Sequence, residues 1–320
     1  MFAIDKSICS FNSESGDAMD FSVMLKLQGM LFLLTLLGVY ARRRNIITEK
    51  ARSHLSDLLI EIILPMNILS SFDIQLDPGI FSRAALALLL SFFVQAFCFG
   101  LGMLLYAKTD ESRQAVLRYS TMVSNAAFMG LPIIRAALGS EAALYASVAL
   151  IPLRVFMWSA GLSLFTKTDA KSAVRRLVTH PCNIAVAAGF VVLLIPGGLP
   201  DFLSMAVTSV GNCATAVSML IIGGFLAEID MKTVLSKEAL LYSAVRLLLI
   251  PLVVLGLTSL LHMDRLLSGA LVLLAAMPAG STTAILAAKY GGDAPFASKI
   301  IFVSTLLSLL TLPLFSLIAV

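Results

Sequence analysis

The stretch that decides the fold of this chain is Ser124-Asn125-Ala126-Ala127-Phe128-Met129-Gly130-Leu131-Pro132-Ile133-Ile134. It lies within an apolar run, roughly 113–139, that is long enough to cross a bilayer as a helix. Pro132 cannot donate a backbone hydrogen bond, and Gly130 eases departure from helical geometry just before it. Unwound backbone at membrane depth is tolerated only inside protein or beside a cavity. The stretch therefore predicts a helix broken near mid-membrane, with Asn125 facing a site; the alternative is a proline kink with Asn125 bonded to a neighbour.

A second interrupted segment strengthens the first interpretation. It reads Met277-Pro278-Ala279-Gly280-Ser281-Thr282-Thr283 and lies within another apolar run, roughly 266–289. Interrupted segments at corresponding positions of two halves are the best sequence indication of a transporter binding site. The pair of breaks therefore favours a transport site over two unrelated kinks.

The composition is that of an integral membrane protein. The chain is 59% hydrophobic and only 13% charged, with a mean hydropathy of +0.95, whereas soluble domains are about 25% charged. Repeated windows of about twenty apolar residues favour helices over a barrel. The net charge of +4 is too small to indicate nucleic acid as a partner. The four cysteines and three histidines show no metal-ligand spacing, so we expect no metal and no cofactor.

The apolar runs predict an all-α protein of about ten transmembrane helices, arranged as two repeats of five. After a polar extension, 1–20, the repeats cover 21–166 and 182–320, and a basic loop, 167–181, joins them. We keep Met1 and Met19 as alternative starts of translation. The spans are expected at roughly 21–40, 51–72, 81–107, 113–139 and 142–165, then 183–195, 202–227, 239–261, 266–289 and 295–319.

The placement of charge predicts the topology. Five spans per repeat is an odd number, so the two repeats must be inverted relative to each other. Most of the 23 lysines and arginines follow odd-numbered spans, and basic loops stay in the cytoplasm. We therefore expect a multi-pass protein of the plasma membrane with both termini outside the cell.

With both breaks placed, the sequence resembles the auxin efflux carrier family, which includes bacterial permeases for malate and malonate. The residues that carry the resemblance are Asn125 with Gly130-Leu131-Pro132, and Met277-Pro278. The resemblance implies a fold like that of sodium–proton antiporters and bile-acid symporters. Spans one, two, six and seven would form a scaffold and a homodimer surface, and the other six a moving transport domain. It also implies that Asn125, Pro132 and Pro278 bind substrate where helices four and nine cross.

Two departures from the family pattern bear on the substrate. Plant carriers have a second proline in the ninth span, where this chain has Ser281-Thr282-Thr283, and their central loop is long. A small carboxylate is therefore a better expectation than auxin. We expect the hydroxyl of one of these three residues to cap the second half of the ninth helix, so that two helix N-termini make a positive pole. The expected substrate site combines Asn125, Gly130, Pro132, Pro278, Ser281, Thr282 and Thr283.

Charged and polar residues inside the other spans are further candidates. Arg154 and Arg246 are costly in a bilayer and should face an interior or cavity. Each would attract the anion or replace a coupling sodium ion; the alternatives are an internal ion pair or an arginine that reaches the interface. Glu61, which shares its span with Asn67, is either a proton relay or the partner of one of those arginines. Arg135 would lie near the cavity or at the interface.

These observations predict a secondary active transporter that carries a small organic anion by elevator-type alternating access. No Walker motif is present, so a gradient of protons or sodium, or the membrane potential, must drive it. The alternatives are a bile-acid-type symporter or a cation–proton antiporter on the same scaffold. An adjacent aspartate pair, which the antiporter would need, is missing in mid-span. A membrane-embedded enzyme or sensor is a further alternative, against which stand the missing HExxH and GxSxG motifs.

Overall fold

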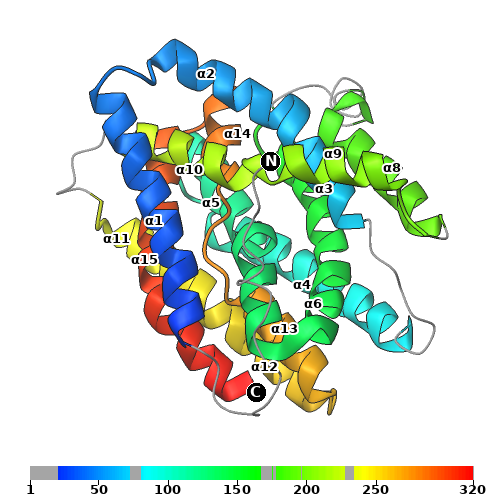
Figure 1. Cartoon of the computed structure of the whole chain (residues 1–320). Coiled ribbons are helices and arrows are strands. Elements are labelled where there is room, and N and C mark those ends of the chain that lie inside the picture. Colours follow the sequence, from blue (N-terminus) through cyan, green and yellow to red (C-terminus); the bar gives the residue numbers. More distant parts are fainter. Residues whose placement is uncertain are drawn as a thin grey trace.

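The computed structural model describes residues 21–72, 81–166, 175, 178–195, 197–227 and 234–319. The regular structure of this part is helical (Figure 1). Its single β-type pairing is an isolated antiparallel bridge between Ser124 and Ala279. The expected N-terminal extension, 1–20, and most of the basic loop expected at 167–181 lie outside the described residues.

The helices follow the apolar runs of the sequence, and several contain a π-helical turn (η). In the first half they are α1 (Phe21–Arg43), α2 (Glu49–Leu58), η2 (Leu59–Ile63), α3 (Leu64–Phe72), α4 (Phe81–Leu105), α5 (Glu111–Met122), η3 (Ala126–Gly130), α6 (Leu131–Phe156) and η4 (Met157–Gly161). In the second half they are α8 (Pro181–Leu194), α9 (Asp201–Gly211), α10 (Cys213–Leu226), α11 (Lys237–Ala244), η6 (Val245–Leu249), α12 (Ile250–Leu260), α13 (Arg265–Ala275), α14 (Thr282–Tyr290) and α15 (Ala294–Ala319).

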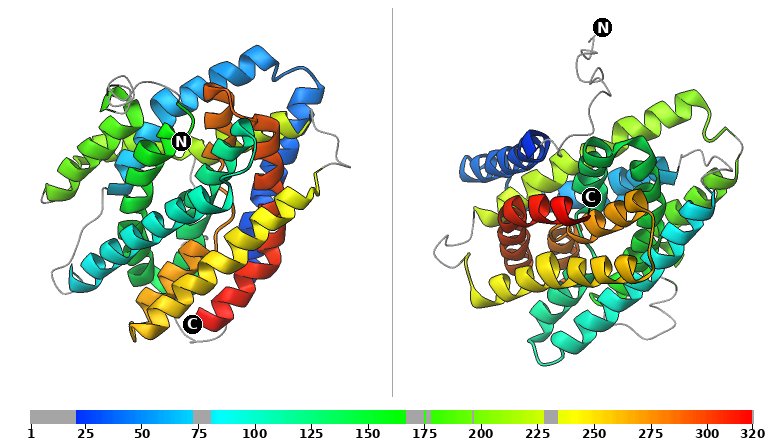
Figure 2. Two further views of the ribbon diagram at one scale, coloured as in Figure 1. Left: turned by 180° about the vertical axis from the view of Figure 1, so that it is seen from behind. Right: turned by 90° about the horizontal axis from the view of Figure 1, so that it is seen from below.

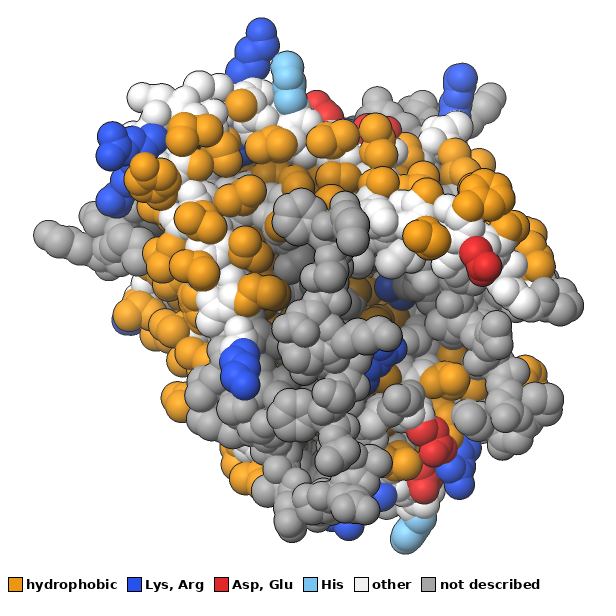
Figure 3. All heavy atoms as spheres, viewed as in Figure 1, with side chains coloured by type: hydrophobic (Ala, Val, Ile, Leu, Met, Phe, Trp, Pro, Cys, Tyr) orange, Lys and Arg blue, Asp and Glu red, His pale blue; other side chains and the backbone are white. Residues whose placement is uncertain are grey.

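Five helical stretches of the described part are long and apolar enough to cross a membrane. They are Phe81–Leu105, Glu141–Gly161, Asp201–Leu226, Lys237–Leu260 and Ala294–Ile318. Large apolar side chains are exposed on the outside of the molecule, for example Leu104 and Leu310 at 77% and 75%. On the face drawn in Figure 3, hydrophobic side chains cover α1, while charged side chains gather mainly near the upper and lower margins. This is the surface of a multi-pass membrane protein.

A glycine separates the segments that we expected as the fourth and fifth spans. Gly139 has φ +86° inside α6, a left-handed conformation that glycine adopts without steric penalty. The helix therefore changes direction there, and its longer arm continues through η4.

The helices pack in two groups. In the first group α1 packs on α10, and α3 packs on α8 and α9. Gly38 and Gly223 bring the backbones of α1 and α10 so close that neither position has room for a Cβ atom, a device of small residues that is common between membrane helices. In the second group α6 packs on α4 and α13, and α15 packs on α11, α13 and α14. Helices of the second group run side by side across the back of the molecule (Figure 2, left).

Candidate functional site

Two broken helices meet in the middle of the molecule. Between α5 and η3 the backbone leaves the helical region at Val123 (φ −105°, ψ 112°), and a second unwound segment joins α13 to α14. The backbone N–H of Asn125 donates to the Pro278 carbonyl at 2.8 Å, and the backbone N–H of Gly280 donates to the Val123 carbonyl at 3.1 Å. Each break thus supplies partners for backbone groups of the other, which lets both unwind at membrane depth.

The first break lies earlier in the chain than the sequence indicated. Gly130 has helical dihedral angles (φ −68°, ψ −48°), and Pro132 lies in the first turn of α6, directly after the π-helical turn η3. A Cβ atom on Gly130 would lie 3.2 Å from side-chain atoms of both Leu274 and Met277. Gly130 therefore permits close packing on the partner segment. The ring of Pro132 lies outside the described part of the structure.

The crossing has two electrical poles. The N-termini of η3 and α14 line one cavity together, and the C-terminal ends of α5 and α13 converge on the Arg246 side chain. A helix N-terminus acts like about half a positive charge, because its first amides have no partner within the helix, and a C-terminus acts like about half a negative charge. One side of the crossing is therefore suited to an anion and the other to a cation.

A cavity of about 30 Å³ lies on the N-terminal side. Its walls come from α3, from both unwound segments and from the end of α6 with η4. Arg154, Trp158, Asn125 and Ser281 all line it. The space is close to the volume of one water molecule, so a larger ligand enters only when the surrounding helices move.

Several buried polar atoms at this cavity have no hydrogen-bond partner among the described residues. They are Asn125 Oδ1, Arg154 Nη1, Trp158 Nε1 and Ser281 Oγ. Arg154 is 3% exposed, and no described carboxylate lies within ion-pair distance of it. A buried cation without a counter-charge is costly, so such a group calls for an anionic ligand.

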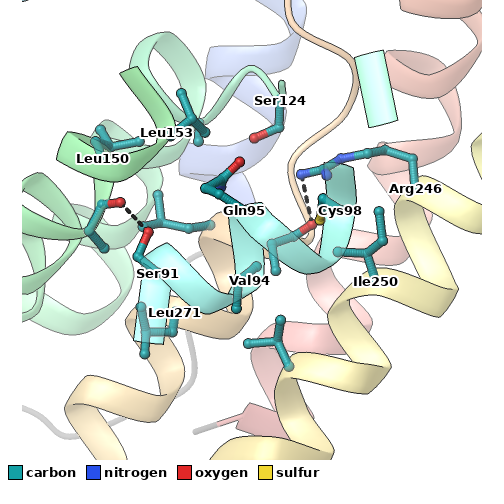
Figure 4. A pocket seen from close by; sticks show the side chains of 15 residues that line it. Ser91, Val94, Gln95, Cys98, Ser124, Leu150, Leu153, Arg246, Ile250 and Leu271 are labelled. Atoms are coloured by element: carbon teal, nitrogen blue, oxygen red, sulfur yellow. Dashed lines mark hydrogen bonds between the residues drawn. The ribbon is translucent and has the colours of Figure 1, made fainter. Parts of the chain in front are cut away.

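The C-terminal side of the crossing is occupied by Arg246. This side chain is 3% exposed, and its Nε, Nη1 and Nη2 donate to the carbonyls of Met277, Thr121 and Ala275 at 3.0, 3.0 and 3.1 Å. These carbonyls belong to the ends of α5 and α13, so one guanidinium offsets both helix C-termini. A second cavity of about 30 Å³ lies beside it, lined also by Gln95 and Ser124 (Figure 4).

The hydroxyl groups expected as caps behave differently from the prediction. Ser281 is the N-cap residue of α14, yet its side chain makes no capping bond, because its backbone is already helical (φ −58°, ψ −29°). Thr282 lines the cavity, and its Oγ1 accepts from the Tyr119 hydroxyl at 3.1 Å. Thr283 is fully buried, and its Oγ1 has no partner among the described residues. The cap prediction was therefore wrong, although Ser281 and Thr282 do lie at the cavity.

The remaining candidates separate into one that lies at the cavity and two that do not. Asn67 lines the cavity while its Nδ2 donates to the Gly211 carbonyl at 3.2 Å, which ties α3 to α9. Glu61 is half exposed and pairs with Lys289 at 2.7 Å, so the alternative that it partners Arg154 or Arg246 was wrong, while its role as a proton relay stays a prediction. Arg135 is exposed on α6 and is not among the residues that line this cavity, so of its two expected positions the structure favours the one at the interface.

The sequence analysis missed two aromatic residues of this region. Trp158 lines the cavity, and the Tyr119 hydroxyl joins the first broken helix to the second. One signal was available for Trp158: it follows Arg154 by four residues, which places both on one face of a helix.

Comparison with known proteins gives two matches. Residues 29–316 match a family described as "Membrane transport protein". The chain is also similar to an "Uncharacterized transporter" of Methanothermobacter thermautotrophicus, with 26% identity over 297 residues. That alignment covers 89% of this chain and 95% of the relative.

Proposed function

This chain belongs to the membrane transport protein family, as its resemblance to auxin efflux carriers predicted, and from this premise we propose that it is a secondary active transporter of a small organic anion. The substrate class is a short carboxylic acid such as malate or malonate. The transporter works in the plasma membrane with both termini outside, and a proton gradient or the membrane potential drives it.

The observation that carries the proposal is the position of Arg154. This buried guanidinium without a carboxylate partner lines the same cavity as Asn125, at the side of the crossing where two helices begin. None of the described residues that line the cavity is an aspartate or glutamate. A carboxylate would supply the missing counter-charge for Arg154 and accept bonds from the free amides of the helix N-termini. A cation–proton antiporter would need an acidic residue in this position.

An elevator mechanism is supported by where the cavity lies between the two helix groups. We assign α1–α3 and α8–α10 to the scaffold, which also forms the homodimer surface, and α4–α6 and α11–α15 to the transport domain of two inverted repeats. The cavity beside Arg154 has α3 on one wall and the crossing on the other. Asn125 also lines a smaller cavity, of about 20 Å³, that α1, α10 and α15 enclose. A rigid displacement of the transport domain against the scaffold would therefore open a site at Asn125.

Arg246 supports a transport cycle that needs no sodium. Its guanidinium already fills the position between the two helix C-termini, where three backbone carbonyls converge. Backbone carbonyls at such helix ends coordinate sodium in other transporters. A fixed cation in that place makes the metal ion redundant.

The proposal is tested by ligand binding to purified protein. Ligands stabilise a protein by mass action, so melting temperatures are recorded with malonate, malate and succinate, and with chloride as the control anion. Arg154→Gln removes the buried charge, and Arg135→Gln removes an exposed arginine of the same helix as a matched control. We expect Arg154→Gln to lose the stabilisation by the acids and Arg135→Gln to keep it. Equal stabilisation of both variants and the wild type would show that the anion site lies elsewhere.

A further inference from the structure

Trp158 is the single tryptophan of the 320-residue chain, and it lies at the substrate cavity. Its side chain is 1% exposed, and its Nε1 has no hydrogen-bond partner among the described residues. A buried indole N–H usually finds an acceptor, and a donor left without one is costly. The unsatisfied N–H therefore calls for an explanation that packing alone does not give.

Two residues at the start of α8 hold the indole in position. The Trp158 ring stacks on His180, with ring centroids 5.0 Å apart and an interplanar angle of 26°. Asn183 Nδ2 donates to the Trp158 backbone carbonyl at 2.7 Å. Both contacts use the ring face or the backbone, so neither occupies the indole N–H.

Trp158 and Arg154 are two donors on one face of the same helical segment. They are four residues apart, which is about one helical turn, and both line the one cavity with an unpartnered nitrogen. A ligand that satisfies Arg154 alone leaves the Trp158 donor unpaired. A ligand with a second oxygen acceptor, about one turn from the first carboxylate, satisfies both donors.

We propose that Trp158 is a substrate-binding residue that selects bifunctional acids. In this assignment, which rests on the proposed function, Arg154 holds one carboxylate and the Trp158 N–H donates to a second oxygen-bearing group of the same short acid. Rejection of simple monocarboxylates follows, because a site built to bond a polar group binds poorly to an analogue that lacks it.

The first test compares two acids on the wild-type protein and on the variants Trp158→Phe, Arg154→Gln and His180→Asn. Affinities for malonate and acetate are measured by calorimetry on the purified full-length protein. Trp158→Phe keeps an aromatic ring on His180 and removes only the N–H. We expect it to weaken malonate binding about tenfold, the loss of one buried hydrogen bond to a charged group, and to leave acetate binding unchanged. Arg154→Gln should weaken the binding of both acids.

The variant His180→Asn distinguishes a structural role of the indole from a role in substrate binding. This variant removes the ring stack and leaves the indole N–H in place, and asparagine is a good N-cap residue. It should retain the preference for malonate. If Trp158→Phe keeps that preference, or if His180→Asn removes it to the same extent, the assignment of the N–H to substrate is overturned while the proposed function stands. If Arg154→Gln binds both acids like the wild type, the proposed function itself fails.

A second measurement uses the wild-type protein, so it does not depend on whether a variant folds. Because the chain has one tryptophan, fluorescence excited at wavelengths that tyrosine does not absorb reports from the cavity alone. Saturating malonate should shift the emission of the wild-type protein, and acetate at equal occupancy should leave it nearly unchanged. An emission spectrum that does not respond to bound malonate overturns the inference.

Discussion

Lys289 Nζ lies 2.7 Å from Glu61 Oε1, and this ion pair joins the two helix groups. Asp57 Oδ1 lies 3.3 Å from the same nitrogen, so two carboxylates on the α2–η2 segment hold one lysine near the end of α14. The side chains of Lys289 and Glu61 are 22% and 48% exposed. The proposed displacement of the transport domain against the scaffold would break this contact once in each cycle.

The first prediction is that Lys289→Met changes the rate of transport and leaves substrate affinity unchanged. A partly exposed pair contributes about 1 kcal/mol at most, so its loss should change the rate of counterflow in proteoliposomes by up to about fivefold. Arg83→Met is the matched control, because Arg83 pairs with Glu141 at 3.1 Å within one helix group. Equal effects of the two variants would argue against an ion pair that breaks during transport.

The second prediction concerns Arg246. Arg246→Met leaves two helix C-termini and three carbonyls without their donor, so it should lower the free energy of unfolding by about 3–5 kcal/mol. Arg265→Met, a change of an exposed arginine at the start of α13, should have little effect. Chemical denaturation of the purified proteins measures the difference.

Arg246 also predicts the ion dependence of the wild-type protein. Because the guanidinium fills the cation pole, uptake into proteoliposomes should persist when choline replaces sodium. Strict dependence on sodium would contradict the role given to Arg246, whatever the stability of the variant.

The third prediction separates the two asparagines of the cavity. The Asn125 side chain faces the cavity, while its backbone N–H makes the bond to Pro278. Asn125→Ala should therefore weaken malonate binding by about 1–3 kcal/mol while the crossing stays folded. Asn125→Asp should bind more weakly still, because it places a negative charge beside the anion.

Asn67→Ala is the comparison for the two Asn125 variants. Asn67 Nδ2 donates to the Gly211 carbonyl. Asn67→Ala should therefore lower the melting temperature clearly and the affinity for malonate only slightly. Isothermal titration and thermal melting, done on the same monodisperse samples, distinguish the two effects. Unchanged affinity of both Asn125 variants would place the site away from the crossing.

The two breaks were predictable because proline and glycine inside an apolar run interrupt a helix locally, and a polar amide there indicates that the segment does not face lipid. The exact residues of the first break were not, because the backbone stays helical from η3 through Gly130 into α6, and the unwinding at Val123 depends on a hydrogen bond from Gly280, far along the chain. The site residues divide in the same way. Arg154 was recognisable from its charge alone, whereas the role of Trp158 at the cavity depends on tertiary packing of α8 against η4.

The fourth prediction is a loss of stability in mild acid that depends on His180. His180 Nδ1 accepts from the Cys182 amide at 3.2 Å and so caps α8. Burial lowers the pKa of His180 below its ordinary value of 6.5, and the charge of Lys289 lowers it further, while Glu61 opposes both. The protonated ring cannot accept the amide bond, so protonation favours the unfolded chain.

The sign of the effect follows from that lowered pKa. The contribution of His180 is fully present above about pH 6.5 and is lost as the pH falls through the lower pKa of the folded protein. Loss of the cap should cost about 1 kcal/mol, seen as a lower melting temperature at pH 5 than at pH 8. His180→Asn keeps a capping side chain that does not titrate, so its melting temperature should fall less over this range. His262→Asn is the control: His262 is exposed at φ +49°, a conformation that asparagine tolerates, and this variant should keep the wild-type dependence on pH. A His180→Asn protein with the wild-type pH profile would rule out His180 as the titrating group.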